Sequence, residues 1–370
     1  MSARTRLCIV NPFQHGGGAE FQISLLIAAL RQADRFDVYY LARHVDETIT
    51  PEGYTVVRIG RSGRVPFLGY ITDLVPLYRA LRAIGPQVIY QRVAGGYTGI
   101  CALYARRHRA RMIWHVAHET DVTPQTLDAG RNFLRRRLEK WSVEYAIRRA
   151  DRIVVQTRDQ GALLSRHYGR QADAVIGNFH PEPAEAIDKS GPPTVVWIAN
   201  LKRWKQPEVF VRLAQSLRDM EGVQFVMLGE APSGSQHWCE MLMQSIQVTP
   251  NLTYLGHRAQ DEVNKVLARA SVFVNTSVHE GFPNTFIQAW LRNAVVVSLT
   301  VNPDRVLETQ GVGIHAGTEA GLTQAVRTLL TNPAERAGYA ERARAYASSA
   351  HSVRNVGVLM EMIDACAARA

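Results

Sequence analysis

Residues 252–299 read LTYLGHRAQDEVNKVLARASVFVNTSVHEGFPNTFIQAWLRNAVVVSL. Three short apolar runs lie in this stretch, at residues 252–255, 272–275 and 295–299, and two longer segments with helically spaced apolar residues separate them. Continuous apolar runs are typical of parallel strands that are covered on both faces. The stretch therefore predicts strand, helix, strand, helix and strand within one parallel α/β sheet.

The same alternation extends toward the N-terminus. It adds strands at residues 195–199 and 224–228, and the first half of the chain holds a second series of apolar runs, at residues 7–12, 38–42, 54–59, 88–91, 112–117, 153–156 and 174–176. Helical patterns lie between these runs. The segment HPEPAEAIDKSGPP, residues 180–193, separates the two series, and its four prolines indicate a linker.

Two series of this kind predict two doubly wound, Rossmann-like domains that face each other across a cleft, at residues 1–180 and 194–350, with residues 181–193 as the linker. Ligands of such sheets bind at the carboxyl ends of the strands, so we expect the site in that cleft. The last segment, residues 351–370, has a helical apolar face that suits packing back on the first domain.

The composition is that of an ordinary globular protein: 370 residues, of which 46% are hydrophobic and 21% charged. No apolar run approaches the length that spans a bilayer, and the start MSARTRLCIVNPF lacks a signal-peptide pattern, so we expect a cytoplasmic protein. The four cysteines, Cys8, Cys101, Cys239 and Cys366, form no CxxC pair, which favours packed thiols over a metal site.

The net charge of +10 lies entirely in the first half of the chain. Residues 1–178 hold 26 Lys and Arg against 15 Asp and Glu, whereas the second half is almost neutral. This asymmetry indicates an anionic partner for the first half: a membrane surface, a phosphorylated acceptor or nucleic acid. A solvated basic surface without such a partner is the alternative.

A glycine-rich turn follows the first strand. The order is RLCIVNPF, then HGGGAE with Gly17 and Gly18, then the helical FQISLLIAAL. Glycines let the backbone approach a ligand closely, and a helix N-terminus offers unpaired N–H groups, so a phosphate suits this turn. A tight turn without a ligand is the alternative interpretation.

Two further motifs lie in the second half. In VNTSVHEGFPNTFIQAW, residues 274–290, a buried strand leads to Glu280, and a helix begins near Pro283. In VVWIANLKRWKQPEVF, residues 195–210, a strand ends in a loop that carries Lys202, Arg203 and Lys205. Cations at the end of a strand would stabilise the charge that grows on a leaving phosphate.

Together these motifs resemble the retaining glycosyltransferases of family 4, which have the GT-B fold. The glycine turn is similar to their GG-x-E start, and EGFPNTFIQAW is similar to their E-x7-E motif. The order of elements in residues 252–299 and the later NPDRVLETQGVG, residues 302–313, also match the family. The resemblance covers most of the chain and is strongest from residue 252 to residue 313.

The resemblance implies roles for individual residues. Lys205 would bind the diphosphate, Lys202 or Arg203 would replace the family's arginine, and Glu280 would contact the transferred sugar. Gln288 stands where the family has its second glutamate, so we expect weakened ribose binding. The full set of predicted donor-binding residues is Gly17, Gly18, Lys202, Arg203, Gly281, Phe282, Pro283, Asn284 and Gln288.

Two histidines follow a strand of the first half, in RMIWHVAHETDV, residues 111–122. The family often has one histidine here, near the sugar, and His118 fits that position better than His115. The predicted catalytic residues are therefore His118, Lys205 and Glu280, with Arg92 and His115 on the acceptor side. The nearby E-x-D lacks a third metal ligand, so no metal site is predicted.

A basic helix is predicted at residues 131–149. An apolar stripe on it is surrounded by basic residues that include Arg131 and Lys140; its members are Phe133, Leu134, Leu138, Trp141 and Tyr145. Core packing is the favoured interpretation of the stripe, and membrane contact is the alternative. The arginines support a hypothesis in which the first domain lies peripherally on the inner membrane face, where lipid-linked acceptors reside.

These observations predict a retaining, metal-independent glycosyltransferase that uses a nucleotide-sugar, with UDP or GDP as its carrier, and no tightly bound cofactor. The predicted acceptor is a glycan or a lipid-linked glycan, in cell-surface polysaccharide assembly. One alternative is an epimerase or phosphorylase of the same fold, and another is a degenerate copy that only binds nucleotide-sugar. A nucleic-acid binder is disfavoured, because no recognisable nucleic-acid module is present.

Overall fold

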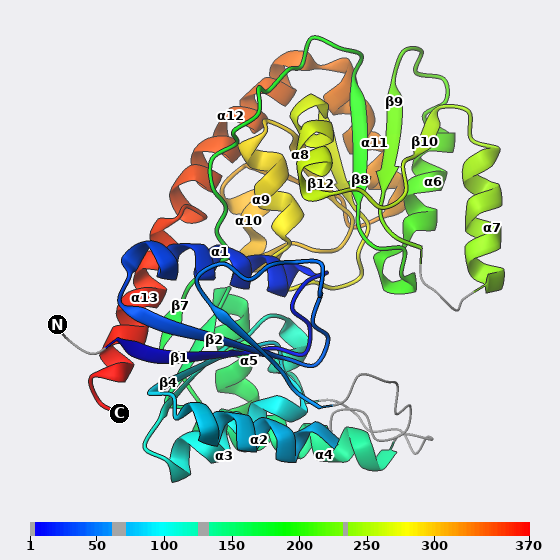
Figure 1. Cartoon of the computed structure of the whole chain (residues 1–370). Helices are drawn as coiled ribbons and strands as arrows, with labels where there is room; N and C mark the ends of the chain where they lie inside the picture. Colours follow the sequence, from blue (N-terminus) through cyan, green and yellow to red (C-terminus); the bar gives the residue numbers. More distant parts are fainter. Residues whose placement is uncertain (1–3, 61–71, 125–132, 232–235) are drawn as a thin grey trace. The chain divides into compact units, whose positions relative to one another are not determined.

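The structure is a computed structural model that describes residues 4–60, 72–124, 133–231 and 236–370. The chain forms two compact units (Figure 1). Unit 1 comprises Met1–Phe179 together with Val353–Ala370, and unit 2 comprises His180–Ser352. Each unit contains one parallel β-sheet with helices on both faces, which confirms the predicted α/β class with two doubly wound domains.

The sheet of unit 1 has the strand order β3-β2-β1-β4-β5-β6-β7. The strands are β1 (Thr5–Val10), β2 (Phe36–Ala42), β3 (Thr55–Arg58), β4 (Val88–Arg92), β5 (Arg111–His115), β6 (Arg152–Val155) and β7 (Ala174–Val175). The chain proceeds from β1 outward to β3 and then returns to the other side of β1. The direction therefore reverses between β1 and β4, at a topological switch point where such sheets bind ligands.

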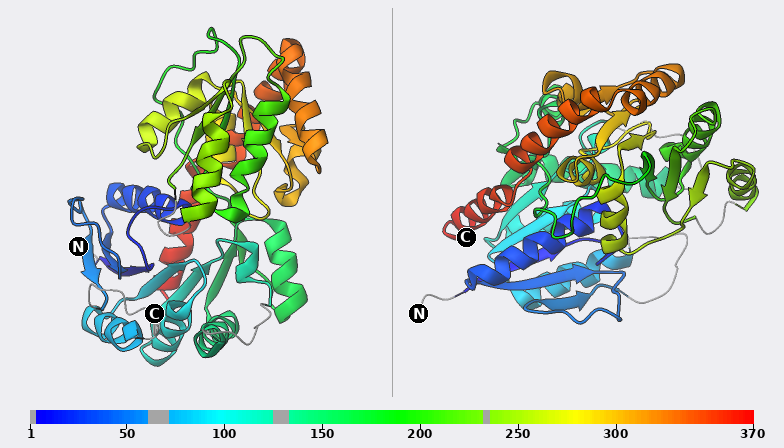
Figure 2. Two further views of the ribbon diagram at one scale, coloured as in Figure 1. Left: turned by 90° about the vertical axis from the view of Figure 1, so that its right-hand side faces the viewer. Right: turned by 90° about the horizontal axis from the view of Figure 1, so that it is seen from above.

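Two layers of helices cover this sheet. One face carries α1 (Gly18–Ala33) and α13 (Arg354–Ala367), which share a core with the strands (Figures 1 and 2). The other face carries α2 (Leu74–Ile84), α3 (Gly96–Arg107), α4 (Phe133–Arg149) and α5 (Arg158–Tyr168), and a short turn η2 (Glu119–Asp121) follows β5. The buried Ile23, Ile27 and Leu30 of α1 are spaced by three and four residues, which gives the helix one apolar face.

The predicted core packing of the stripe on α4 is wrong for four of its five residues. Phe133 is 38% exposed, Leu134 69%, Leu138 44% and Trp141 63%. Leu134, Leu138 and Trp141 share one face of the helix, as the helical period indicates, but that face points away from the sheet. Arg131, which the sequence places beside the stripe, lies outside the described residues.

The sheet of unit 2 has the equivalent order β10-β9-β8-β11-β12-β13. Its strands are β8 (Thr194–Ile198), β9 (Gln224–Leu228), β10 (Leu252–Tyr254), β11 (Val272–Asn275), β12 (Val295–Ser298) and β13 (Gly313–His315). The switch point lies between β8 and β11, which pair at Val272↔Val195 and Phe273↔Val196. The sequence did not predict β13, whose three residues are too few to show a pattern.

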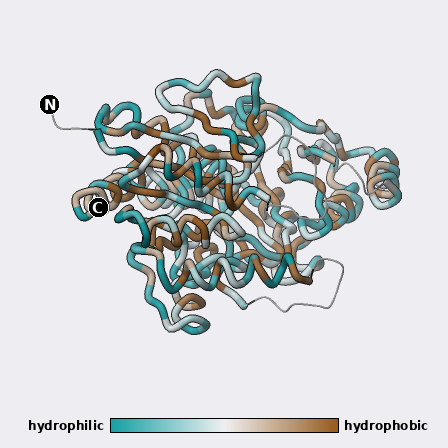
Figure 3. Tube along the Cα trace, turned by 60° about the horizontal axis from the view of Figure 1, so that its bottom comes forward, coloured by the Kyte–Doolittle hydropathy of each residue, from teal (hydrophilic) through white to brown (hydrophobic). Residues whose placement is uncertain are grey.

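Helices cover both faces of this second sheet as well. One face carries α6 (Pro207–Ser216), α7 (Gln236–Gln247) and α11 (Glu319–Thr331), and the other carries α8 (Gln260–Arg269), α9 (Asn284–Leu291), α10 (Val306–Thr309) and α12 (Pro333–Ala350). Brown and teal alternate along the helices, as expected for helices with one buried face (Figure 3). Among the described residues, no helix combines the length and apolar character that crossing a bilayer requires.

Candidate active site

The switch point of unit 2 brings two of the predicted motifs together. The loop after β8 contains the short helix η3 (Arg203–Lys205), and the loop after β11 contains residues 276–283. Backbone carbonyls of the first loop accept hydrogen bonds from the second: the Val278 amide donates to the Trp204 carbonyl at 2.9 Å, and Thr276 Oγ1 donates to the Lys205 carbonyl at 2.6 Å. The backbone of both loops is therefore fixed close to the strand ends.

Lys205 and Glu280 form an ion pair across these two loops. Their side chains are only 15% and 14% exposed. Ser277 Oγ donates a hydrogen bond to Glu280 Oε1 at 2.8 Å, and Lys205 Nζ lies 4.1 Å from the centre of the Trp204 ring. Burial lowers the pKa of Lys205, and the Glu280 carboxylate opposes that shift. An ammonium that has lost most of its water interacts strongly with any further anion that reaches it.

Lys202 and Arg203 lie on the same loop and are exposed. Arg203 is directed toward α7, where its guanidinium lies 5.4 Å from the centre of the Trp238 ring. Lys202 immediately precedes η3 and approaches Lys205 closely enough to help lower the pKa of that lysine. Which of the two replaces the family's arginine stays a prediction.

The other predicted donor-binding residues of unit 2 differ in exposure. Gly281, Phe282 and Pro283 are buried, and Phe282 packs against Trp290 with ring centres 6.1 Å apart. Gln288 lies on α9 and is 5% exposed. Asn284, at the start of α9, is partly exposed and lies 3.4 Å from a ring nitrogen of His180. Phe282 thus anchors the loop in the core, and direct donor contact by these residues stays a prediction.

A pocket of about 160 Å³ lies at the switch point of unit 1. It is lined by Asn11, Pro12, Phe13, Glu20, Gln91, Val93, Ala94, Gly95, Gly96 and Tyr97. Gly17 directly precedes α1, and Asn11 Nδ2 donates a hydrogen bond to Glu20 Oε1 at 2.6 Å across the glycine turn. Val93 has a φ of 70°, a conformation that costs a β-branched residue energy and that proteins often retain at functional sites.

Several of these pocket residues were missed by the sequence analysis. The glycine pair Gly95-Gly96 after β4 was the available signal, because it stands at the start of α3 as Gly17 and Gly18 stand at the start of α1. No sequence pattern indicates the positive φ of Val93.

His118 begins the η2 turn and is partly exposed. Its Nδ1 accepts a hydrogen bond from the Thr120 amide at 3.2 Å, so the neutral ring carries its proton on Nε2. Asp121 Oδ2 accepts from the amides of Ala117 and His118 at 2.9 and 3.0 Å, and burial raises the pKa of Asp121 to about 6. The turn is thereby held rigidly, with Nε2–H as the donor that His118 presents.

The predicted acceptor-side residues Arg92 and His115 are buried inside unit 1. His115 Nδ1 lies 2.8 Å from the Tyr90 hydroxyl, and Arg92 donates a hydrogen bond to Asn178. Burial and the nearby Arg92 charge lower the pKa of His115 well below its ordinary value, so the ring is neutral. Contact with an acceptor would require this network to open, and the acceptor role of both residues stays a prediction.

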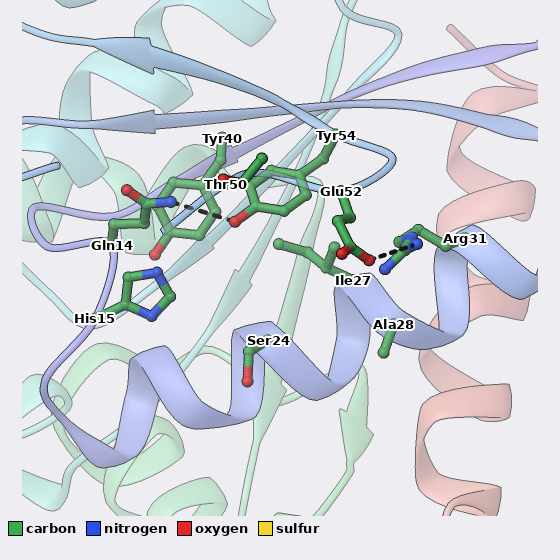
Figure 4. Close-up of a pocket in the computed structure, with 10 residues that line it drawn as sticks. All are labelled: Gln14, His15, Ser24, Ile27, Ala28, Arg31, Tyr40, Thr50, Glu52 and Tyr54. Carbon is green, nitrogen blue, oxygen red and sulfur yellow. Dashed lines mark hydrogen bonds and ion pairs between the residues drawn. The ribbon is translucent and has the colours of Figure 1, made fainter. Parts of the chain in front are cut away.

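A second pocket in unit 1, of about 220 Å³, lies between the middle and last turns of α1 and the segment that follows β2 (Figure 4). It is lined by Gln14, His15, Ser24, Ile27, Ala28, Arg31, Tyr40, Thr50, Glu52 and Tyr54. Gln14 Nε2 donates to the Tyr54 hydroxyl at 3.2 Å, and Arg31 pairs with Glu52 at 3.3 Å. Nε2 of His15 is buried without a hydrogen-bond partner among the described residues. The sequence analysis did not predict this pocket.

No group of three or more His, Cys, Asp or Glu side chains suited to a metal ion occurs among the described residues. Glu119 and Asp121, the E-x-D of the sequence, belong to the η2 turn instead.

Comparison with known families decides between the interpretations of this fold. Residues 16–179 match the family described as Glycosyltransferase Family 4, and residues 192–332 match the one described as Glycosyl transferases group 1. The chain belongs to the family 4 glycosyltransferases. The resemblance predicted from the motifs is thereby confirmed, and the protein is a glycosyltransferase.

Solved structures share the fold of this glycosyltransferase. HepE of Anabaena in complex with UDP and glucose is 17% identical, with a TM-score of 0.77 over 98% of this chain and 100% of that one. Sucrose-phosphate synthase of Thermosynechococcus elongatus is 16% identical, with a TM-score of 0.78 over 97% and 98%. WaaG, described as a glycosyltransferase involved in lipopolysaccharide biosynthesis, is 13% identical, with a TM-score of 0.73 over 97% and 99%. No curated protein matched the sequence.

Proposed function

We propose that this glycosyltransferase moves a sugar from a nucleoside diphosphate sugar to a hydroxyl of a glycan or lipid-linked acceptor, with retention of anomeric configuration and without a metal. The observation that carries the proposal is the desolvated Lys205–Glu280 pair at the switch point of unit 2. The Lys205 ammonium, which can bind the diphosphate, lies beside the Glu280 carboxylate. The oxygens of that carboxylate can accept hydrogen bonds from hydroxyl groups of the sugar.

The chemistry follows from these groups. The acceptor hydroxyl attacks the anomeric carbon from the face that the diphosphate leaves, and the bond to the diphosphate oxygen breaks with its electron pair. The hydroxyl proton passes to that departing oxygen. Lys205, with Lys202 or Arg203, stabilises the departing charge in place of a metal ion, and the backbone N–H groups at Gly17 and Gly18 add a second set of donors. His118 Nε2–H donates to a hydroxyl of the transferred sugar.

We propose UDP as the carrier, with GDP as the alternative, and no tightly bound cofactor. The fold neighbour HepE has been solved with UDP and with UDP-glucose, which supports UDP without excluding GDP. Because WaaG is involved in lipopolysaccharide biosynthesis, we also propose a place in cell-surface polysaccharide assembly. The basic unit 1 fits an anionic, lipid-linked acceptor and a peripheral position on the inner face of the cell membrane.

Calorimetric titration with UDP, GDP, ADP, dTDP and CMP in the absence of metal tests the proposed donor. We expect saturable binding of UDP, followed by transfer of sugar from the UDP-sugar to an added acceptor with the anomeric configuration retained. Binding of none of the five would overturn the donor site, and isomerisation of the donor without transfer would indicate an epimerase.

We propose the pocket beside α1 as the acceptor subsite, because its mixture of aromatic faces and hydroxyl groups suits a sugar. Tyr54→Ala should raise KM for the acceptor about tenfold and leave KM for the donor unchanged, since it removes one packing face and one hydroxyl. Steady-state kinetics with each substrate varied in turn checks this. Tyr54→Phe, which keeps the ring, should retain most of the affinity; an equal rise in both KM values would contradict the assignment.

A further inference from the structure

A third pocket, of about 740 Å³, lies in unit 2 and includes none of the predicted donor-binding residues. The linker forms one of its walls and α12 another. Its charged and polar lining side chains come from several parts of the unit; among them are Lys189, Ser271, Asn293, Arg336, Glu341 and Arg344. Pockets of this size hold whole small molecules rather than single ions. We refer to this pocket as the α12 pocket.

The α12 pocket lies at the edge of the sheet opposite to the candidate active site. Ser271 directly precedes β11, and Asn293 lies two residues before β12. Lys205 and Glu280 lie in the loops that follow the carboxyl ends of β8 and β11. Because the strands are parallel, their amino ends share one edge, and the four residues of β11 separate the two edges by about 10 Å. A ligand in the α12 pocket would therefore not compete with the donor.

Fixed contacts hold the linker wall of the pocket in place. Arg292, the C-cap residue of α9, is paired with Glu185 of the linker and has a side chain that is only 5% exposed. Ser348 of α12 donates a hydrogen bond to Glu182 at 2.7 Å, and the linker runs beside α12 (Figure 1). The fold of unit 2 therefore forms the α12 pocket before any ligand arrives, as is usual for small-molecule sites.

Two cations of the α12 pocket are held by helix ends. Lys189 Nζ donates hydrogen bonds to the carbonyl groups of Leu267 and Ala270, at the end of α8. Arg336 Nη1 donates to the Leu329 carbonyl of α11 at 2.6 Å. Neither cation forms an ion pair with a carboxylate among the described residues. Both groups have more N–H donors than these bonds use, so each is oriented and still able to bind an anion.

The two cations also lie close enough to repel each other. Partial desolvation, together with the charges of Arg292 and Arg336, lowers the pKa of Lys189 to about 7. Asp188 opposes that shift, but its Oδ1 already accepts hydrogen bonds within the linker. The Glu185 carboxylate offsets the Arg292 charge, whereas Arg336 has no such carboxylate in the described part of the chain. An anion between Lys189 and Arg336 would relieve this repulsion.

Positive charge is a property of the α12 pocket and not of unit 2 as a whole. The pocket lining has three cations, Lys189, Arg336 and Arg344, against one carboxylate, Glu341. The half of the chain that contains unit 2 is almost neutral overall. Arg344 is paired with Glu182 only loosely, at 3.8 Å, and solvent screens this half-exposed pair. The pocket therefore attracts anions more strongly than its surroundings do.

The remaining lining of the pocket is small and polar. Ala337 and Ala340 lie on the face of α12 that meets the pocket, within about 60° of Arg344 around the helix axis. Their small side chains leave the room that forms the pocket. Ser271 and Asn293 contribute a hydroxyl and an amide that form no side-chain hydrogen bond among the described residues. Such neutral groups suit the hydroxyl groups of a polar organic molecule.

We propose that the α12 pocket binds a phosphorylated small molecule, with its phosphate between Lys189 and Arg336 and its polar organic part along the alanine face of α12. A phosphate monoester carries about two negative charges at neutral pH, which matches the two cations. Its oxygens accept several N–H donors at once, whereas a carboxylate offers fewer oxygens and less charge. This second ligand takes no part in sugar transfer, so the site goes beyond the proposed function.

Calorimetric titration of the full chain tests the site. The protein is first saturated with UDP, so that the donor site is filled, and is then titrated with glucose 6-phosphate, inorganic phosphate or glucose. Glucose 6-phosphate should bind saturably, inorganic phosphate about tenfold more weakly, and glucose not at all. Binding of neither phosphate compound, or equal binding of glucose and glucose 6-phosphate, would overturn the proposal. Binding that UDP abolishes would also overturn it, because the phosphate would then occupy the donor site.

Two variants remove the site in different ways. Ala337→Leu with Ala345→Leu fills the α12 pocket and keeps all of its cations, and it should weaken glucose 6-phosphate binding about tenfold or more. Arg336→Gln removes one of the phosphate-binding cations and should weaken that binding about tenfold as well. The matched controls are Ala334→Leu, at an exposed alanine of α12 outside the pocket lining, and Arg218→Gln, at an exposed arginine elsewhere in unit 2. Both controls should bind glucose 6-phosphate as the wild type does.

The outcomes separate binding from stability and from the proposed function. Arg336→Gln also loses a helix-end contact, but the filled variant keeps that contact and should unfold at the wild-type temperature. Wild-type binding of glucose 6-phosphate by the filled variant, or equal losses in the two controls, would overturn the site. All variants should bind UDP as the wild type does. Binding of glucose 6-phosphate by a protein that binds no nucleoside diphosphate would leave this site standing and refute the proposed donor site.

Discussion

Replacing Lys205 with Ala should lower kcat about 10²–10³-fold, as removal of one preorganised donor to a developing negative charge does in other enzymes. The structural reason is that the Lys205 ammonium is 15% exposed and its carboxylate partner is tied to Ser277. Without the cation, the diphosphate would leave into a loop where Glu280 repels it. Initial rates of transfer from the donor, with binding of UDP measured separately, check the prediction.

Lys189→Ala is a matched control for that variant. Lys189 is another lysine of unit 2 with a partly desolvated ammonium, which lowers its pKa to about 7. Its ammonium donates to the carbonyl groups of Leu267 and Ala270 at the end of α8, away from the switch point. Its loss should reduce stability and leave kcat unchanged; a comparable loss of kcat in both variants would mean that the Lys205 effect is structural.

The pH dependence of the wild type follows from the same residue. Because burial lowers the pKa of Lys205, the ammonium loses its proton at a lower pH than an exposed lysine would. Donor affinity should therefore be highest below that pKa and should fall as the pH rises through it.

The fold was predictable from the sequence because its decisive features are local. Strands such as 272–275 are continuous apolar runs, and four prolines within residues 180–193 indicate the linker. The exposed α4 stripe was not predictable, since helical periodicity shows that apolar residues share a face but not whether that face meets the sheet or the solvent. The short strand β13 carried too few residues to show a period.

The candidate site was predictable in part. Lys205 and Glu280 are 75 positions apart and each lies in the loop that follows a strand, so the parallel topology that the sequence indicated was enough to bring them to one edge. The burial of Arg92 and His115 could not be predicted from the sequence. Their partners Tyr90 and Asn178 reach them only through strand pairing and through the return of the chain after β7.

Glu280→Gln should lower kcat about 10²-fold while leaving UDP bound at least as tightly as in the wild type at neutral pH. The carboxylate is assigned to hydroxyl groups of the transferred sugar, which UDP lacks, and it competes with the diphosphate for Lys205. The amide keeps one acceptor oxygen, so the side chain fits the same space, but the charge-assisted hydrogen bond to the sugar is lost. Calorimetry with UDP and initial rates with the UDP-sugar separate the two effects.

The same substitution makes a second, independent prediction about Lys205. In the wild type the Glu280 carboxylate opposes the lowering of the Lys205 pKa by burial. In Glu280→Gln that opposition is gone, so the pKa of Lys205 falls further and the alkaline loss of UDP affinity should begin at a lower pH. Glu319→Gln, which breaks a half-exposed ion pair with Arg212 in the same unit, should shift neither kcat nor this profile. If Glu280 only stabilised the loop, UDP affinity would fall at every pH together with kcat.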